Sequence, residues 1–86
     1  MNNPIIDFYG NKKWINENYN LHRDDGPAII YCNGDKTWYQ DGKIHRVDGP
    51  AYIRVNGYQE WWINGHFLNV KSQQEFERYM KLKAFW

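Results

Sequence analysis

The sequence predicts a mainly β (α+β) protein, namely an antiparallel β-meander of repeated hairpins with one C-terminal α-helix packed on the sheet. Three observations lead to this prediction. A unit of sequence recurs at a fixed offset, paired turn residues divide that unit into short strands, and a helix signal follows the last copy. At 86 residues the chain has room for one domain with a small core.

The repeat consists of four pairs of segments that share one offset of 23 residues. The pairs are Leu21-His22-Arg23 with Ile44-His45-Arg46, Asp25-Gly26-Pro27-Ala28 with Asp48-Gly49-Pro50-Ala51, Asn33-Gly34 with Asn56-Gly57, and Trp38 with Trp61. The start of the chain is a degraded copy with one extra residue, placed near Tyr19. We therefore expect residues 1–20 to be a degraded first repeat or cap, 21–69 hairpin repeats, and 70–86 a helix and tail.

Paired turn residues mark the ends of the predicted strands. Asn-Gly and Asp-Gly pairs favour two-residue type I′ hairpins, because both central residues need a positive φ. The pairs are Asn33-Gly34, Asp41-Gly42, Asn56-Gly57 and Asn64-Gly65. The runs between the turns are rich in β-branched and aromatic residues, as strands are. We expect strands over 5–9, 12–16, 21–23, 28–32, 36–40, 43–46, 51–55, 58–63 and 66–68.

The end of the chain has the pattern of an amphipathic helix. Ser72 and Glu75 form a capping box, in which each side chain can bond an amide at the helix start. Phe76, Tyr79 and Met80 follow at helical spacing, which predicts a helix over 73–82 with one apolar stripe. We expect this stripe to cover a face of the sheet.

Two-residue loops would divide the side chains of the meander between two faces, because directly opposed residues share a face. The predicted core face holds Ala28, Ile30, Cys32, Tyr39, Ile44, Ala51, Ile53, Val55, Trp62 and Phe67, with the helix stripe against Ile30, Ile53 and Trp62. The predicted second face holds Ile29, Tyr31, Trp38, His45, Tyr52, Arg54, Trp61 and Leu68. A one-residue bulge would exchange the faces locally.

The composition limits the classes of partner. With eleven basic and ten acidic residues the net charge is +1, which argues against strong attraction to DNA, RNA or an anionic membrane. Cys32 is the only cysteine, so we expect it to be a small buried side chain in a protein of a reducing compartment. Neither a leader pattern nor an apolar run of about 18 residues is visible, so we expect a cytoplasmic protein without a membrane partner.

The two His-Arg segments are the first candidate sites, because the guanidinium of Arg23 or Arg46 could bind phosphate or carboxylate. The alternative is structural: each arginine pairs with a nearby aspartate, and His22 and His45 each hydrogen-bond a turn carbonyl. Recurrence within a repeat favours this alternative. The histidines and Cys32 are not spaced as metal ligands, and no nucleophile stands beside a base. We therefore expect no enzyme activity, no cofactor and no metal.

An aromatic, mildly basic strip on the second face is the main candidate for binding a partner. Its residues are Tyr31, Trp38, His45, Tyr52, Arg54 and Trp61. Protein interfaces are enriched in exposed rings and arginine, and the same groups could stack single-stranded nucleic acid. The strip could instead be a second core layer. The secondary candidates are His22, Arg23, Arg46 and Trp86.

Residues 38–51 have the pattern Trp-Tyr-x-Asp-Gly-Lys-x-His-Arg-x-Asp-Gly-Pro-Ala. This pattern resembles the tandem repeat of small phage and giant-virus proteins, and between about Pro4 and Asn69 the chain is distantly similar to MORN-type β-hairpin repeats. The His-Arg-x-Asp-Gly-Pro segment is not part of an ordinary MORN unit, so a role in lipid binding does not carry over. The resemblance implies a meander fold and interaction rather than catalysis.

On this resemblance we expect a non-enzymatic protein–protein interaction module. It would be a small phage accessory protein that binds and blocks a host protein, such as a host-defence or CRISPR component, in the host cytoplasm. The alternative is binding of single-stranded nucleic acid through the aromatic strip. We expect a monomer, or a weak dimer through open sheet edges.

Overall fold

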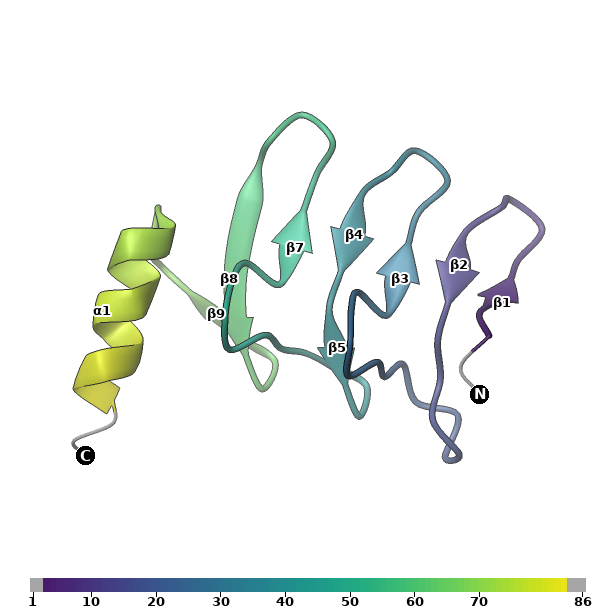
Figure 1. Ribbon diagram of the computed structural model, residues 1–86, viewed down its shortest axis with the longest axis horizontal. Coiled ribbons are helices and arrows are strands. Elements are labelled where there is room, and N and C mark those ends of the chain that lie inside the picture. The colour runs from purple at the N-terminus through teal and green to yellow at the C-terminus, as the bar shows by residue number, and fades with distance from the viewer. Residues whose placement is uncertain (1–2, 84–86) are drawn as a thin grey trace.

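The computed structural model describes residues 3–83, and it confirms the predicted fold class. A seven-stranded antiparallel sheet has the order β1-β2-β3-β4-β7-β8-β9, while β5 and β6 form a separate two-stranded hairpin (Figure 1). The elements are β1 (Ile5–Ile6), β2 (Lys12–Lys13), β3 (Ile29–Ile30), β4 (Lys36–Thr37), β5 (Tyr39–Gln40), β6 (Lys43–Ile44), β7 (Tyr52–Ile53), β8 (Gln59–Ile63), β9 (His66–Leu68) and α1 (Gln73–Lys83).

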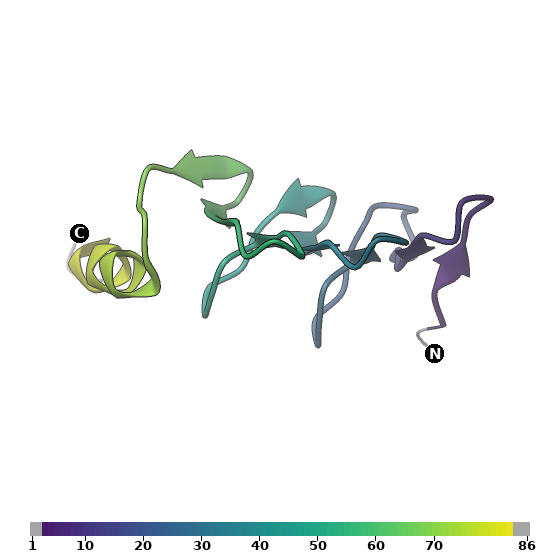
Figure 2. The ribbon, with the colours of Figure 1, turned by 90° about the horizontal axis from the view of Figure 1, so that it is seen from above.

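The repeats form one thin layer. The upper hairpins β1-β2, β3-β4 and β7-β8 stand side by side, and lower hairpins extend from their other ends (Figure 1). The lower hairpins are the loop bridged by Ile15 and Leu21, then β5-β6, then β8-β9. Seen from above, α1 lies at one end of the layer and not across its face (Figure 2), within overall extents of 42 × 30 × 18 Å.

The upper loops hold three residues between their last paired residues, one more than predicted. Tyr31 N donates to Asp35 O at 2.9 Å, so that Cys32, Asn33 and Gly34 form the loop. Gly34 has a φ of 101°, but Asn33 does not have a positive φ, which is the pattern of a type I turn followed by a G1 bulge. A local side-chain bond accompanies this geometry, because Asn33 Oδ1 accepts from Asp35 N at 3.0 Å.

The same geometry recurs in the third repeat, where Arg54 N donates to Tyr58 O at 2.9 Å and Gly57 has a φ of 96°. The predicted type I′ turns at Asn33-Gly34 and Asn56-Gly57 are therefore wrong. Those in the lower loops are confirmed, because Asp41 and Asn64 have φ values of 49° and 50° and the glycines after them are also positive.

The extra loop residue moves the strand register by one. Ile29 lies opposite Thr37, and Tyr52 lies opposite Glu60. Since neighbouring positions of a strand point to opposite sides, this shift exchanges the faces of one strand in each upper hairpin. The structure therefore shows the local exchange of sheet faces that a one-residue bulge was expected to cause.

A row of alternating tryptophan and alanine results, running Trp14, Ala28, Trp38, Ala51, Trp61 across the sheet. The backbone amide of Trp14 donates to Ala28 O, and that of Trp38 donates to Ala51 O, both at 2.8 Å. Both alanines are fully buried. A side chain no larger than methyl occupies each position between two indole rings, which explains why alanine follows each Gly-Pro turn.

The predicted core face is accordingly wrong. Only its two alanines are buried, and they share their face with Trp38 and Trp61, which were expected on the other side. Ile30, Tyr39, Ile44, Ile53 and Trp62 are half-buried, and Cys32, Val55 and Phe67 are exposed. The expectation of a buried Cys32 is also wrong, since its place is in a loop.

Helix α1 begins at the predicted cap residue Ser72, and Glu75 reaches back to the amide of the residue before it. Glu75 N donates to Ser72 Oγ at 3.1 Å, while the Glu75 carboxylate accepts from Lys71 N at 2.8 Å. Its apolar stripe contacts a different part of the sheet from the one expected. Phe76, 1% exposed, packs in one cluster with Trp61 and Leu68, and Ile30, Ile53 and Trp62 do not belong to this cluster. Among residues 3–83 no helix has the length and apolarity needed to cross a membrane.

Side chains of one repeat also bond the upper loop of the next. Asn11 Oδ1 accepts from Cys32 N at 2.7 Å, and Asp35 Oδ1 accepts from Val55 N at 2.9 Å. These two bonds are equivalent in the repeat. They supplement the strand pairs β2-β3 and β4-β7, which join the upper hairpins.

Truncation of Phe76 tests whether the helix is an integral part of the fold. We expect Phe76→Ala to lower the free energy of unfolding by about 3–5 kcal/mol, because it empties a fully enclosed site. Urea denaturation followed by far-UV circular dichroism measures this. The exposed helix residue Arg78, changed to alanine, serves as control and should alter stability by less than about 0.5 kcal/mol. A loss below about 1 kcal/mol for Phe76→Ala would contradict this account.

Candidate functional site

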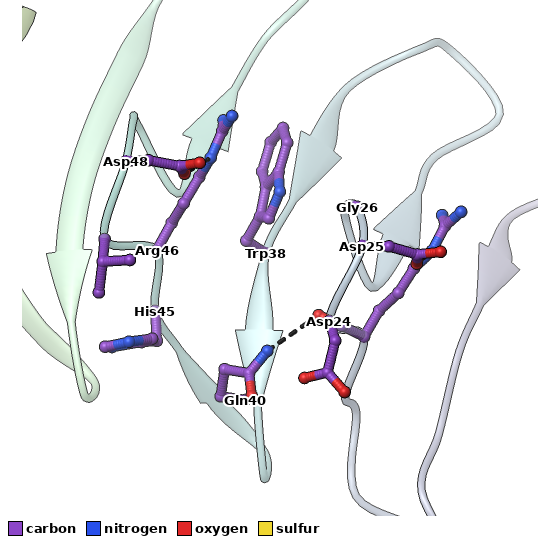
Figure 3. Close-up of a pocket in the computed structure, with 10 residues that line it drawn as sticks. Asp24, Asp25, Gly26, Trp38, Gln40, His45, Arg46 and Asp48 are labelled. Carbon is purple, nitrogen blue, oxygen red and sulfur yellow. Dashed lines mark hydrogen bonds and ion pairs between the residues drawn. The ribbon is translucent and has the colours of Figure 1, made fainter.

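A hollow of the structure lies between the first and second repeats (Figure 3). We call it the open groove. Figure 3 shows Trp38 between Arg46 on one side and the Asp25-Gly26 turn on the other, with Gln40 and His45 below. The residues that line it are Arg23, Asp24, Asp25, Gly26, Trp38, Gln40, His45, Arg46, Val47 and Asp48.

Each arginine that lines the groove is held by its own repeat in an arrangement that we call the clasp. Arg46 Cζ lies 4.0 Å from the ring centroid of Trp38. Its Nε donates to Asp48 Oδ1 at 2.9 Å, and its Nη1 donates to Pro50 O at 3.0 Å. The guanidinium thus joins the tryptophan, the aspartate and the turn of one repeat.

The clasp of the first repeat is the same. Arg23 Cζ lies 3.9 Å from the Trp14 centroid, with Nε to Asp25 Oδ1 at 3.0 Å and Nη1 to Pro27 O at 3.1 Å. The predicted pairing of each arginine with a nearby aspartate is confirmed. Because a ring face and two donors of each guanidinium are used internally, neither arginine presents a free fork to phosphate.

The glycine of each Asp-Gly-Pro turn lies directly against the clasp. A Cβ on Gly49 would lie 2.9 Å from Arg46 Cζ, and one on Gly26 would lie 3.0 Å from Arg23 Cζ. Neither glycine has a positive φ. Glycine at this position therefore allows the close approach of the guanidinium, and a larger side chain would have to move the arginine within the clasp.

Substitution of this glycine tests the clasp. We expect Gly49→Ala to destabilise the protein by about 1–3 kcal/mol, because the methyl group must displace the guanidinium from the Trp38 ring. A double-mutant cycle with Arg46→Ala, measured by thermal and urea unfolding, isolates this cause. In the Arg46→Ala background the cost of Gly49→Ala should largely disappear. An equal cost in both backgrounds would show that the glycine is needed for another reason.

The two histidines of the repeat join one copy to the next. His45 Nδ1 accepts from Asn64 N at 2.9 Å, and His22 Nδ1 accepts from Asp41 N at 3.0 Å. The prediction of a bond to a turn carbonyl is wrong, because the imidazole accepts from a turn amide. In the neutral ring the proton is therefore on Nε2, which in His22 lies 3.2 Å from Asp24 Oδ1.

Removal of one imidazole should weaken the joint between repeats. His45→Ala leaves the Asn64 amide without its acceptor, so we expect a loss of about 0.5–1.5 kcal/mol in urea denaturation. His22→Ala should cost a similar amount. His66 is exposed, and its change to alanine is the matched control with an expected effect near zero. Equal effects of all three substitutions would refute a linking role for the turn bonds.

The residues of the predicted aromatic strip do not form one surface but lie in separate parts of the structure. Trp38 and His45 line the open groove, whereas Tyr31 and Tyr52 line a second hollow on the upper hairpins. Trp61 is 2% exposed, so the expectation that its ring belongs to a binding surface is wrong. The four secondary candidates are also divided: Arg23 and Arg46 line the groove, His22 bonds the next turn, and Trp86 lies outside the described residues.

Arg54 lies on the upper hairpins between two tyrosines. Its Cζ is 5.5 Å from the Tyr52 centroid and 5.2 Å from the Tyr58 centroid, and its Nε donates to the Tyr52 hydroxyl at 2.8 Å. That hydrogen bond raises the pKa of the Arg54 guanidinium. The bond from the Tyr58 hydroxyl to Glu60 raises the pKa of Tyr58.

Sequence reasoning missed several residues of the groove. Gln40, whose Nε2 donates to Arg23 O at 2.9 Å, forms part of its floor (Figure 3). Val47 is 58% exposed at its edge, and Asp24 and Asp48 stand at its rim. The signal that could have found Gln40 and Val47 is the repeat itself, since 23 residues later the chain has Ile63 and Val70, both apolar.

Comparisons of the chain with protein-family models, with curated proteins and with solved structures found no match. Within residues 3–83 no three side chains of histidine, cysteine, aspartate or glutamate gather where they could hold a metal ion. The geometry of the groove and of the clasps is therefore the basis for a functional proposal.

Proposed function

We propose that this chain is a non-enzymatic protein-binding module that acts by occupying a surface of another protein. The resemblance of its repeat to small phage and giant-virus proteins supports a more particular role. In that role it is a phage accessory protein that blocks a host protein, such as a component of host defence or CRISPR, in the host cytoplasm.

One observation carries the proposal: the groove between the first and second repeats is open, while its equivalent between the second and third is partly filled by α1. There α1 packs Phe76 against Trp61 and Leu68, and Gln73 bonds the Trp61 indole. The fold thus contains a place that binds polypeptide and a second place of the same kind without an occupant from residues 3–83.

The charges around the open groove favour a protein over a nucleic acid. The guanidiniums of Arg23 and Arg46 are each paired with an aspartate. The third aspartate of the groove, Asp24, lies beside His22 instead of an arginine, and its side chain is 81% exposed at the rim. Binding of a phosphate backbone depends on cations that are not already neutralised, and exposed carboxylates oppose it.

A capture experiment with matched variants tests the proposal. The tagged protein is used to isolate partners from host lysate, with and without nuclease treatment and over a series of salt concentrations. We expect a protein partner that survives nuclease and is lost with Val47→Lys, which places a charge in the groove. Val55→Lys is the control, because Val55 has a similar exposure of 66% but lies in an upper loop.

Two other outcomes of the capture experiment would contradict the proposed binding of a protein in the open groove. Loss of every partner on nuclease treatment, with steep weakening by salt, would replace the proposal with nucleic-acid binding, for which Arg54 and its tyrosines are the best place. Loss of the partner with Val55→Lys but not with Val47→Lys would move the interface to the upper hairpins. Both variants should unfold like the parent protein, as exposed substitutions usually do.

A further inference from the structure

We propose that the open groove recognises the side-chain carboxamide of a glutamine on the partner protein, in the place that Gln73 takes in the following repeat. This inference rests on the proposed protein-binding function and specifies the chemical group that is recognised. Its support is the equivalence of two successive grooves in one chain, of which one is occupied.

The two grooves correspond residue by residue. Helix α1 is held by a cluster that includes Trp61, Ile63, Leu68 and Val70. The residues 23 positions earlier in the chain are Trp38, Gln40, His45 and Val47, and all four line the open groove. The open groove is therefore the counterpart of the binding place of α1, with glutamine and histidine in place of isoleucine and leucine.

Gln73 shows how a carboxamide is held in the occupied groove. Its Oε1 accepts from Trp61 Nε1 at 2.9 Å, and its Nε2 lies 3.5 Å from the carbonyl oxygen of Asp48, to which it donates. The Nε2 group also donates to Glu77 Oε2 at 3.0 Å. An indole N–H and a turn carbonyl thus offer one donor and one acceptor to the same planar group.

The open groove has the same two polar groups. The equivalents of Trp61 Nε1 and Asp48 O are Trp38 Nε1 and Asp25 O, and the structure records no hydrogen-bond partner for either among residues 3–83. Gly49, which adjoins the occupied groove, is buried, whereas Gly26 at the open groove is only half-buried. An occupant of the open groove would cover Gly26 and so bring its burial closer to that of Gly49.

A sequence difference between the second and third repeats indicates which chemical groups the partner must supply. In the third repeat Asn69 stands where the clasp arginine would be, and Trp61 packs instead against Phe76 at 6.4 Å between ring centroids. In the second repeat Arg46 already covers Trp38. The partner therefore needs no aromatic side chain for this ring, and the carboxamide is the group that the groove lacks.

The charges of the groove select a carboxamide over a carboxylate. A glutamate at the same place would set an anionic oxygen against the Asp25 carbonyl, in a lining whose three aspartates outnumber its two arginines. This excess of negative charge, with the Asp24 carboxylate 81% exposed at the rim, instead favours basic residues on either side of the glutamine. The inferred recognition element is a glutamine flanked by lysine or arginine.

Short capped peptides test this inference on the unmodified protein. The probes are N-acetyl, C-methylamide forms of Lys-Gln-Lys and Lys-Glu-Lys, titrated to about 10 mM while the indole N–H resonances are followed by NMR. We expect the Trp38 indole resonance to shift with Lys-Gln-Lys, with affinity about tenfold higher than for Lys-Glu-Lys. The Trp61 resonance should stay in place, because Gln73 already bonds that indole. No shift at Trp38, or equal binding of the two peptides, would overturn the inference.

A conservative variant extends the test to the captured partner. Trp38→Phe removes the indole N–H and keeps a ring for Arg46, and we expect it to weaken partner binding about tenfold. Trp62→Phe is the matched control, because it removes an indole N–H bonded to Glu60 outside the groove. If a nuclease-resistant partner is captured and Trp38→Phe binds it as well as the parent, only the carboxamide inference fails. If only nucleic acid is captured, the proposed function fails with it.

Discussion

The stacking of an arginine guanidinium on a tryptophan ring is the interaction on which this fold depends. A one-layer sheet has no second sheet to bury its rings, and a chain of 86 residues has little apolar surface to spare. In each clasp a guanidinium covers one ring in place of a second sheet: Arg23 covers Trp14, and Arg46 covers Trp38. Each guanidinium is itself held by an aspartate and a turn carbonyl. The cation is attracted to the ring, and it covers one face of the ring against water.

The end of the array follows from the same constraint. Where a further repeat would follow, the chain replaces the arginine by Asn69 and the linking histidine by Leu68, and both changes suit the approach of an apolar helix. Leu68 then packs in the cluster of Trp61 and Phe76. At the other end Ile5 and Ile6 of β1 are 51% and 58% exposed, so within residues 3–83 a helix covers the β9 end of the array and leaves β1 uncovered.

The sequence predicted those features that depend on residue type alone. The repeat predicted the hairpins, and Ser72 and Glu75 predicted the start of the helix. The extra residue near Tyr19 was also placed correctly, because Tyr19 lies in a lower loop with a φ of 65°. The faces were wrong because Asn-Gly suits both a two-residue and a three-residue loop, and the residue types of the turn do not distinguish them. The groove was found only in part, since which tryptophan the helix covers depends on where α1 packs, and neither Gln40 nor Val47 has a chemical signature of its own.

The bonds between repeats described above reach only from one copy to its neighbour, as His22 to Asp41 and His45 to Asn64 show. Internal duplication of one 23-residue unit would therefore lengthen the array without disturbing either end, as in other stacked-repeat proteins. Each added unit would bring one more unoccupied groove, spaced at the repeat distance along a stiff layer. Copy number would then set valency, so that a target with evenly spaced sites would be held by a longer relative through avidity, with no change in any single contact.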